Sequence, residues 1–182
     1  MKTLLCLSLA AFLVASGSSM TFAAGGDSGD SAPEPVKKCK KGEVPKKVAN
    51  IWKCVKVETG ILPDEELYQQ GRALAKAGEY EWALQVLAAI QNQNDPRVLN
   101  YTGYSNRKAG RLEIGITYYR KALAIDPNFV LAREYLGEGY VAAGRIDLAK
   151  LELNEIKARA GTGSEEYQDL SRAIATGVVA AD

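Results

Sequence analysis

The chain carries side chains suited to binding but few suited to catalysis. None of its 182 residues is a histidine, so the usual proton carrier and commonest metal ligand near neutral pH is absent. The adjacent acids Glu65 and Glu66, and Glu165 and Glu166, are the remaining candidates for acid–base chemistry. Acids near helix starts are favoured by the helix dipole, so they need no catalytic explanation. We therefore expect no enzyme, no catalytic residue, no metal and no cofactor.

A pair of cysteines is the next group with possible chemistry. Apart from Cys6 in the N-terminal segment, the chain contains only Cys39 and Cys54. Two thiols alone do not form a tetrahedral zinc site. In an exported protein they predict one disulfide that closes a short loop, and a pair of free thiols is the alternative.

Lysines are concentrated around the two cysteines. The segment 37–56 contains eight lysines and one acid, Glu43, whereas the whole chain has a formal net charge of +1. The lysines of this basic arm are Lys37, Lys38, Lys40, Lys41, Lys46, Lys47, Lys53 and Lys56. Such asymmetry suggests attraction to an anionic surface such as lipid head groups or glycans, and nucleic acid is not expected as a partner. We expect a Lys-rich cysteine loop over 37–57, and the alternative to surface binding is a solvated appendage whose charges only maintain solubility.

The N-terminal segment has the features of a secretory signal peptide. Met1 and Lys2 form a short basic start, and residues 4–14 form an apolar run that is too short to span a bilayer as a helix. Small residues follow, so we expect a signal peptide over 1–23 and a periplasmic or secreted protein; a buried helix or an uncleaved anchor is the alternative. Residues 24–36 are rich in Gly, Ser, Asp and Pro and predict a disordered linker.

The elements that carry the remaining side chains repeat along the chain. Gly71, Gly103 and Gly137 recur with a period of about 34 residues, which is typical of stacked helical hairpins. In the same register follow Gly78, Gly110 and Gly144, then Ala83, Gly115 and Ala149, then Leu87, Tyr119 and Leu153. Glycine inside a helix is destabilising, so Gly71, Gly103 and Gly137 indicate that the second helix of each hairpin approaches closely. Gly78, Gly110 and Gly144 predict helix ends in the left-handed conformation.

This pattern resembles the tetratricopeptide repeat (TPR) family over residues 64–160. The second repeat matches through Gly103, Gly110, Tyr119, Ala122 and Pro127, and the third through Leu136, Gly137, Tyr140, Gly144 and Ala149. The first repeat departs from the family in a shorter exit loop. The resemblance implies an all-α solenoid of about three helical hairpins. An amphipathic segment at 164–177, with Tyr167, Leu170 and Ile174 on one face, is expected to cap it.

The same resemblance implies that the first helix of each hairpin lines a concave, exposed groove. Its partner-binding positions would be Tyr68, Arg72, Lys76, Arg97, Asn100, Tyr104, Arg107, Lys108, Glu134 and Glu138. Basic and Asn side chains suit the C-terminal carboxylate of a peptide, although they do not reproduce the family's carboxylate-binding motif position by position. Ordinary solvated helix faces are the alternative, and Tyr118, Tyr119 and Tyr135 are expected in the core.

These observations lead to one functional hypothesis and one alternative. We expect an exported, non-catalytic scaffold whose groove binds a protein or peptide, with an acidic or C-terminal segment as the candidate ligand. In the alternative, the protein tethers the cell envelope: the basic arm binds an anionic surface and the repeats act as a spacer.

Overall fold

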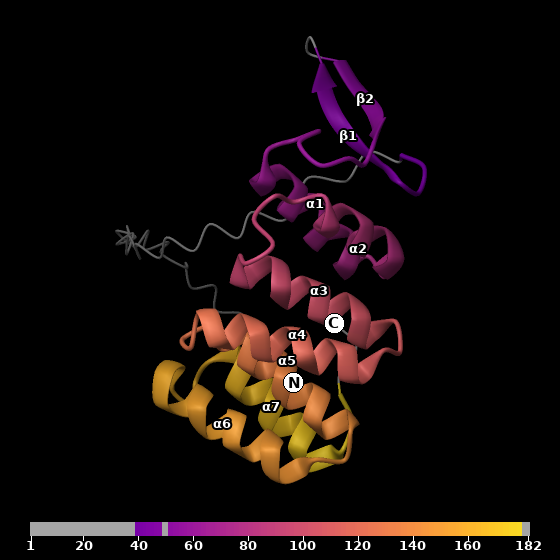
Figure 1. The fold of residues 1–182 in the computed structure, drawn as a ribbon. Coiled ribbons are helices and arrows are strands. Elements are labelled where there is room, and N and C mark those ends of the chain that lie inside the picture. Colours follow the sequence, from indigo (N-terminus) through magenta and orange to yellow (C-terminus); the bar gives the residue numbers. More distant parts are fainter. Residues whose placement is uncertain (1–38, 49–50, 180–182) are drawn as a thin grey trace, which may run out of the picture. The chain divides into compact units, whose positions relative to one another are not determined.

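The computed structural model describes residues 39–48 and 51–179. It contains seven helices preceded by a two-stranded sheet, and the described chain is helical from residue 64 onward (Figure 1). The expected signal peptide and the linker at 24–36 lie outside the described residues, as do Lys37 and Lys38. No described helix is long and apolar enough to span a membrane.

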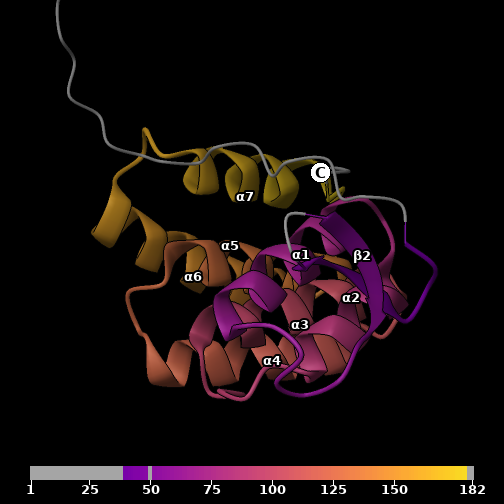
Figure 2. The same cartoon turned by 90° about the horizontal axis from the view of Figure 1, so that it is seen from above.

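Three helical hairpins follow one another as the glycine register predicts. The first is α1 (Asp64–Lys76) with α2 (Tyr80–Ala88), and the second is α3 (Pro96–Lys108) with α4 (Leu112–Ile125). The third is α5 (Val130–Ala142) with α6 (Ile146–Ala160). Each helix packs against the next one in the chain. A capping helix, α7 (Glu165–Thr176), packs against α5 and α6, and Figure 2 shows it beside them.

The glycines have the two roles that the sequence predicts. Gly78, Gly110 and Gly144 have φ between 71° and 85°, and they lie just after the first helix of each hairpin. A Cβ on Gly103 would lie 2.8 Å from Cε1 of Tyr119, so the second helix packs directly on the glycine. For Gly137 the sequence predicted close packing by the second helix of its own hairpin, and this was wrong. The space beside Gly137 is filled by Leu170 of α7, because the capping helix packs closely on α5.

Ion pairs at the surface connect successive hairpins at equivalent positions. Arg111, just before α4, pairs with Glu81 of α2 at 2.6 Å. Arg145, just before α6, pairs with Glu113 of α4, also at 2.6 Å. Exposed pairs contribute little each, but their recurrence shows that the neighbouring hairpins are stacked in the same way.

The described part of the basic arm contains a pair of β-strands, which the prediction of a cysteine loop in an all-α protein did not include. Strand β1 (Glu43–Val48) pairs antiparallel with β2 (Ile51–Lys56), in a register that places Val44 opposite Val55. The disulfide between Cys39 and Cys54 is present, as predicted. Two strands alone are marginally stable, and here Val44 is completely buried in the core that the helices form. Burial of that apolar side chain is the physical reason for the strand.

Candidate partner-binding face

The first helices place four tyrosines in a continuous row. Tyr68 of α1 contacts Tyr101 of α3 with ring centroids 6.0 Å apart, and Tyr101 contacts Tyr104 at the same distance. Tyr104 in turn contacts Tyr135 of α5 at 5.2 Å. The rings meet edge-on or tilted, which is the favourable arrangement for aromatic pairs. All four side chains are buried, so the row is a continuous series of packed rings that crosses the three repeats.

Basic side chains lie on this row and contact its tyrosines. Arg72 Nε donates to the Tyr101 hydroxyl at 3.0 Å, and Lys76 Nζ donates to the Tyr135 hydroxyl at 3.0 Å. The Lys76 ammonium also lies 5.1 Å from the ring centroid of Tyr104. Two more cations are stacked, Arg97 at 4.5 Å from Tyr68 and Lys108 at 5.6 Å from Tyr104. We call these eight residues the cation–tyrosine face: Tyr68, Arg72, Lys76, Arg97, Tyr101, Tyr104, Lys108 and Tyr135.

A buried ion pair joins the second and third repeats beside the face. Nη2 of Arg107 lies 2.7 Å from Oε2 of Glu138, and the side chains are 6% and 2% exposed. Arg107 Nε also donates to the Tyr119 hydroxyl at 3.2 Å. Glu134, one turn before Glu138, is buried as well. Because Arg107 holds α3 against α5 and α4, its position serves packing in this structure.

Asn100 is completely buried on α3, and neither its amide nitrogen nor its amide oxygen has a hydrogen-bond partner. It lies one turn from both Arg97 and Tyr104, so it shares their side of the helix. A buried amide without partners costs free energy that a hydrogen-bonding ligand would recover. Asn100 is therefore a polar position that the packing of the described residues does not account for.

The expectation of a row of exposed side chains was largely wrong. Of the ten predicted positions, Lys76 and Arg97 are exposed and Arg72 and Lys108 are half-buried. The other six are buried: Tyr68, Asn100, Tyr104, Arg107, Glu134 and Glu138. The physical reason is that the first helices pack closely enough for tyrosines of neighbouring repeats to touch. The structure brings Arg72, Lys76 and Lys108 together with the tyrosines. Arg107 also lies over the rings of Tyr104 and Tyr135, but it is buried in the ion pair with Glu138.

Two residues of the face were missed from the sequence. The repeat pattern indicates no role for Tyr101, and it predicts Tyr135 in the core together with Tyr118 and Tyr119. Tyr119 and Tyr135 are buried as predicted, and Tyr118 is half-buried. The hydroxyls of Tyr101 and Tyr135 nevertheless accept from Arg72 and Lys76. The presence of a tyrosine in each first helix was the only available signal.

Burial and neighbouring charge change the titration of two groups on or beside the face. Removal from water, together with the neighbouring Tyr101, raises the pKa of Tyr68 to about 12, although Arg72 and Arg97 oppose the shift. The hydrogen bond from Arg97 lowers the pKa of Asp95, the residue that caps α3. Tyr68 therefore stays protonated, and Asp95 stays ionised, over a wider pH range than the same groups would in water.

Other candidate sites in the described part of the chain are less complete. No group of three or more acids and cysteines there is placed to hold a metal ion. The basic arm has four exposed lysines in the described residues, Lys40, Lys41, Lys53 and Lys56, and Lys46 is half-buried. The side chain of Lys47 is not among those that the structure describes. A hollow of about 490 Å³ is lined by Leu99, Tyr118 and Lys121 among others, and it includes no residue of the cation–tyrosine face.

Comparisons with solved structures identify the fold. The TPR domain of Sgt2 from Aspergillus fumigatus matches with a TM-score of 0.56 and 20% identity over 65% of this chain and 81% of that one. The Yersinia enterocolitica type III secretion chaperone SycD, in complex with a peptide of the translocator YopD, matches at 0.54 and 20% over 65% and 93%. The first TPR of Spaghetti (RPAP3), bound to the HSP90 peptide SRMEEVD, matches at 0.54 and 14% over 66% and 99%. No family model and no curated protein matches the sequence.

The class of fold that follows is a TPR-type helical repeat. This confirms the fold resemblance stated from the sequence, with the β-hairpin as a small addition.

Proposed function

We propose that the protein is an exported, non-catalytic scaffold whose cation–tyrosine face binds an acidic, extended segment of a protein partner. The observation that carries the proposal is the position of Lys76. This side chain belongs to the first repeat, yet its ammonium group contacts Tyr104 of the second repeat and Tyr135 of the third. A positive charge is thereby positioned where three repeats meet.

The chemistry of the face favours an anionic peptide. Carboxylates form charge-assisted hydrogen bonds with guanidinium and ammonium groups, which are about twice as strong as neutral ones. The tyrosines themselves are buried beneath the cations, so they fix the positions of the charged groups. Contacts to tyrosine hydroxyls also restrict Arg72 and Lys76 before a ligand arrives, which reduces the entropy cost of binding.

Proteins of the same fold give a precedent, because the SycD and RPAP3 structures each contain a bound peptide. Export is inferred from the N-terminal sequence alone, through its apolar run and the small residues that follow.

Binding to defined peptides tests the proposal. A library of heptapeptides with free C-terminal carboxylates, SRMEEVD among them, would be titrated against the full chain and its Arg72→Glu/Lys76→Glu variant. We expect acidic peptides to bind and the variant to lose that binding. Reversal of Arg107 is avoided, because it would leave Glu138 buried without its counter-charge. The proposal fails if acidic and neutral peptides bind equally, or if the variant binds as well as the parent.

A matched control is provided by Arg120 on α4. Its Nε donates to the Tyr140 hydroxyl at 3.0 Å, the same contact that Arg72 makes with Tyr101, but Arg120 belongs to a second helix. Arg120→Glu should therefore retain peptide binding while it carries one charge reversal of the same kind. Melting temperatures of all variants would separate lost binding from lost folding.

A second candidate function is the envelope tether through the basic arm. The strand register favours it, because Lys46 of β1 lies directly opposite Lys53 of β2. Like charges at opposed positions destabilise a strand pair, and a bound anion would relieve that repulsion. Replacement of Lys40, Lys41, Lys53 and Lys56 by Gln should abolish co-sedimentation with vesicles rich in anionic lipid. If the peptides still bind to that variant, the two sites are separate.

A further inference from the structure

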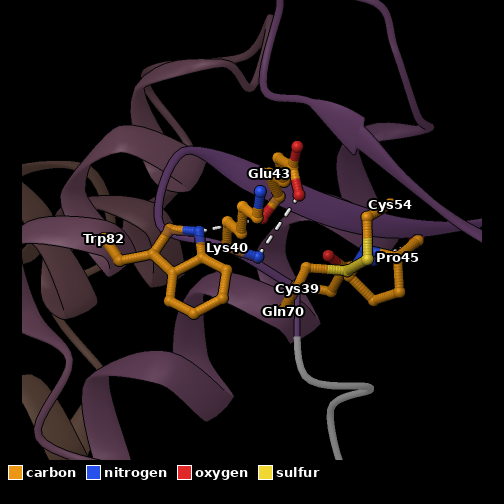
Figure 3. The surroundings of a disulfide bond; sticks show 7 residues. All are labelled: Cys39, Lys40, Glu43, Pro45, Cys54, Gln70 and Trp82. Atoms are coloured by element: carbon orange, nitrogen blue, oxygen red, sulfur yellow. Dashed lines mark hydrogen bonds between the residues drawn. A yellow bond between two sulfur atoms is a disulfide. The ribbon is translucent and has the colours of Figure 1, made fainter.

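We infer that the Cys39–Cys54 disulfide controls the cation–tyrosine face, so that reduction of this bond weakens partner binding. The inference rests on the proposed function, since it concerns regulation of the same face. It begins from the place where the β-hairpin meets the first repeat, which is drawn in Figure 3.

The hairpin contacts both helices of the first repeat. Nε1 of Trp82 on α2 donates to the Glu43 carbonyl at 2.9 Å, and Nε2 of Gln70 on α1 donates to the Pro45 carbonyl at 3.1 Å. Val44, between these two carbonyls, has no exposed surface. Figure 3 shows Trp82 and Gln70 beside the strand that carries Glu43 and Pro45. The hairpin therefore covers the end of the helical array and acts as its N-terminal cap.

A repeat at the end of an array depends on such a cap. In repeat proteins each unit is stabilised mainly by its neighbours. The first repeat has α3 on one side, and among the described residues the hairpin is its other neighbour. The hairpin in turn has only two strands, which are marginally stable without further support. The covalent link between Cys39 and β2 supplies that support, because it closes the segment around β1.

The first repeat also carries three residues of the face. Tyr68, Arg72 and Lys76 all belong to α1, and Gln70 lies between the first two on the same helix. Loss of the cap removes the Gln70 contact and exposes the site of Val44, so α1 and α2 open more often. Each opening separates Lys76 from Tyr104 and Tyr135. Binding at the face therefore becomes weaker, although no ligand touches the disulfide.

The bond is accessible to a reductant. The Cys54 side chain is exposed, whereas Cys39 is half-buried. A thiolate of a dithiol reductant attacks Sγ of Cys54, the sulfur–sulfur bond breaks, and Cys39 leaves as a thiolate that takes up a proton. The second thiolate of the reductant then attacks its own sulfur in the mixed disulfide and releases Cys54, which is protonated in turn. Two electrons and two protons pass to the protein, and the dithiol becomes a disulfide.

Hydrogen exchange on the full chain tests the inference directly. The oxidised chain is compared with the same chain after treatment with dithiothreitol, and a mass increase of two hydrogens confirms reduction. We expect amides of α1 and α2 to exchange about tenfold faster after reduction, and the affinity for the best-binding library peptide to fall by about tenfold, within the usual range of coupling between sites. Exchange in α5 and α6 should not change. Equal exchange of α1 and α2 in the two states overturns the inference.

Two variants separate the disulfide from other effects of the reductant. Cys39→Ser/Cys54→Ser should behave as the reduced chain does and should not respond to dithiothreitol. Trp82→Phe keeps the disulfide but loses the bond to the Glu43 carbonyl, so it should exchange at an intermediate rate in α2. If the oxidised chain binds no peptide, the proposed function fails, while the exchange data still decide whether the hairpin is a redox-dependent cap. If peptides bind equally in both states, the coupling is absent.

Discussion

Glu138 of α5 and Arg107 of α3 form an ion pair, with Oε2 and Nη2 2.7 Å apart, and both side chains are almost completely removed from water. Removal of one partner leaves a buried charge without compensation. Glu138→Ala should therefore lower the free energy of unfolding by about 3–5 kcal/mol, as measured by urea denaturation. Glu113→Ala breaks the exposed pair with Arg145 and should cost less than about 1 kcal/mol. Equal costs would mean that the buried pair has no special structural role.

The close contacts of the interior glycines predict an order of stability among variants. Gly103→Leu would place a side chain against Tyr119, and Gly137→Leu would place one against Leu170. Overpacking of this kind costs about 1–3 kcal/mol or more. Gly110 has open space around it but a φ of 85°, so Gly110→Ala should cost only about 1 kcal/mol of backbone strain. Thermal melts that give the same midpoint for all three variants would contradict the packing argument.

Tyr68 predicts a loss of stability in alkaline solution. Its pKa is raised to about 12 in the folded protein, whereas tyrosine in an unfolded chain has a pKa of about 10. Stability is unaffected below about pH 10 and falls between about 10 and 12, because only the unfolded chain releases the proton there. Urea midpoints measured from pH 8 to 12 should fall more steeply for the parent than for Tyr68→Phe. Parallel curves would show that Tyr68 is not shielded from water.

The lowered pKa of Asp95 predicts a loss of folding stability in acidic solution. Its carboxylate accepts from the Arg97 backbone N–H at 2.8 Å and pairs with the Arg97 guanidinium, and this lowers its pKa. The stability that it contributes is present above the unfolded pKa of about 3.9 and is lost as the pH falls through the lower folded pKa. Asp95→Asn keeps the cap and should show a smaller acid-induced loss in urea midpoints. Asp95→Ala should cost about 1 kcal/mol near neutral pH through loss of the cap.

Much of the fold follows from local sequence features. The left-handed glycines end the first helices at Gly78, Gly110 and Gly144 because only glycine adopts that conformation without strain. Ser164 begins the capping helix by accepting a hydrogen bond from the Tyr167 backbone. These signals act within one or two helical turns, so they can be read in order along the chain. The cysteine pairing was also predictable, because the segment after the expected signal peptide contains only two cysteines.

The cation–tyrosine face could not be derived in the same way. The sequence placed Arg72, Arg107 and Glu138 on equivalent helix faces, but it did not show that Arg107 is buried with Glu138 while Arg72 is only half-buried. That difference depends on distances between helices from different repeats. The same holds for Gly137, whose contact with Leu170 joins α5 to α7. Spacing along the chain therefore determined the helices, their ends and their order, while packing between repeats decided which polar groups were buried, because burial depends on neighbours that local sequence does not specify.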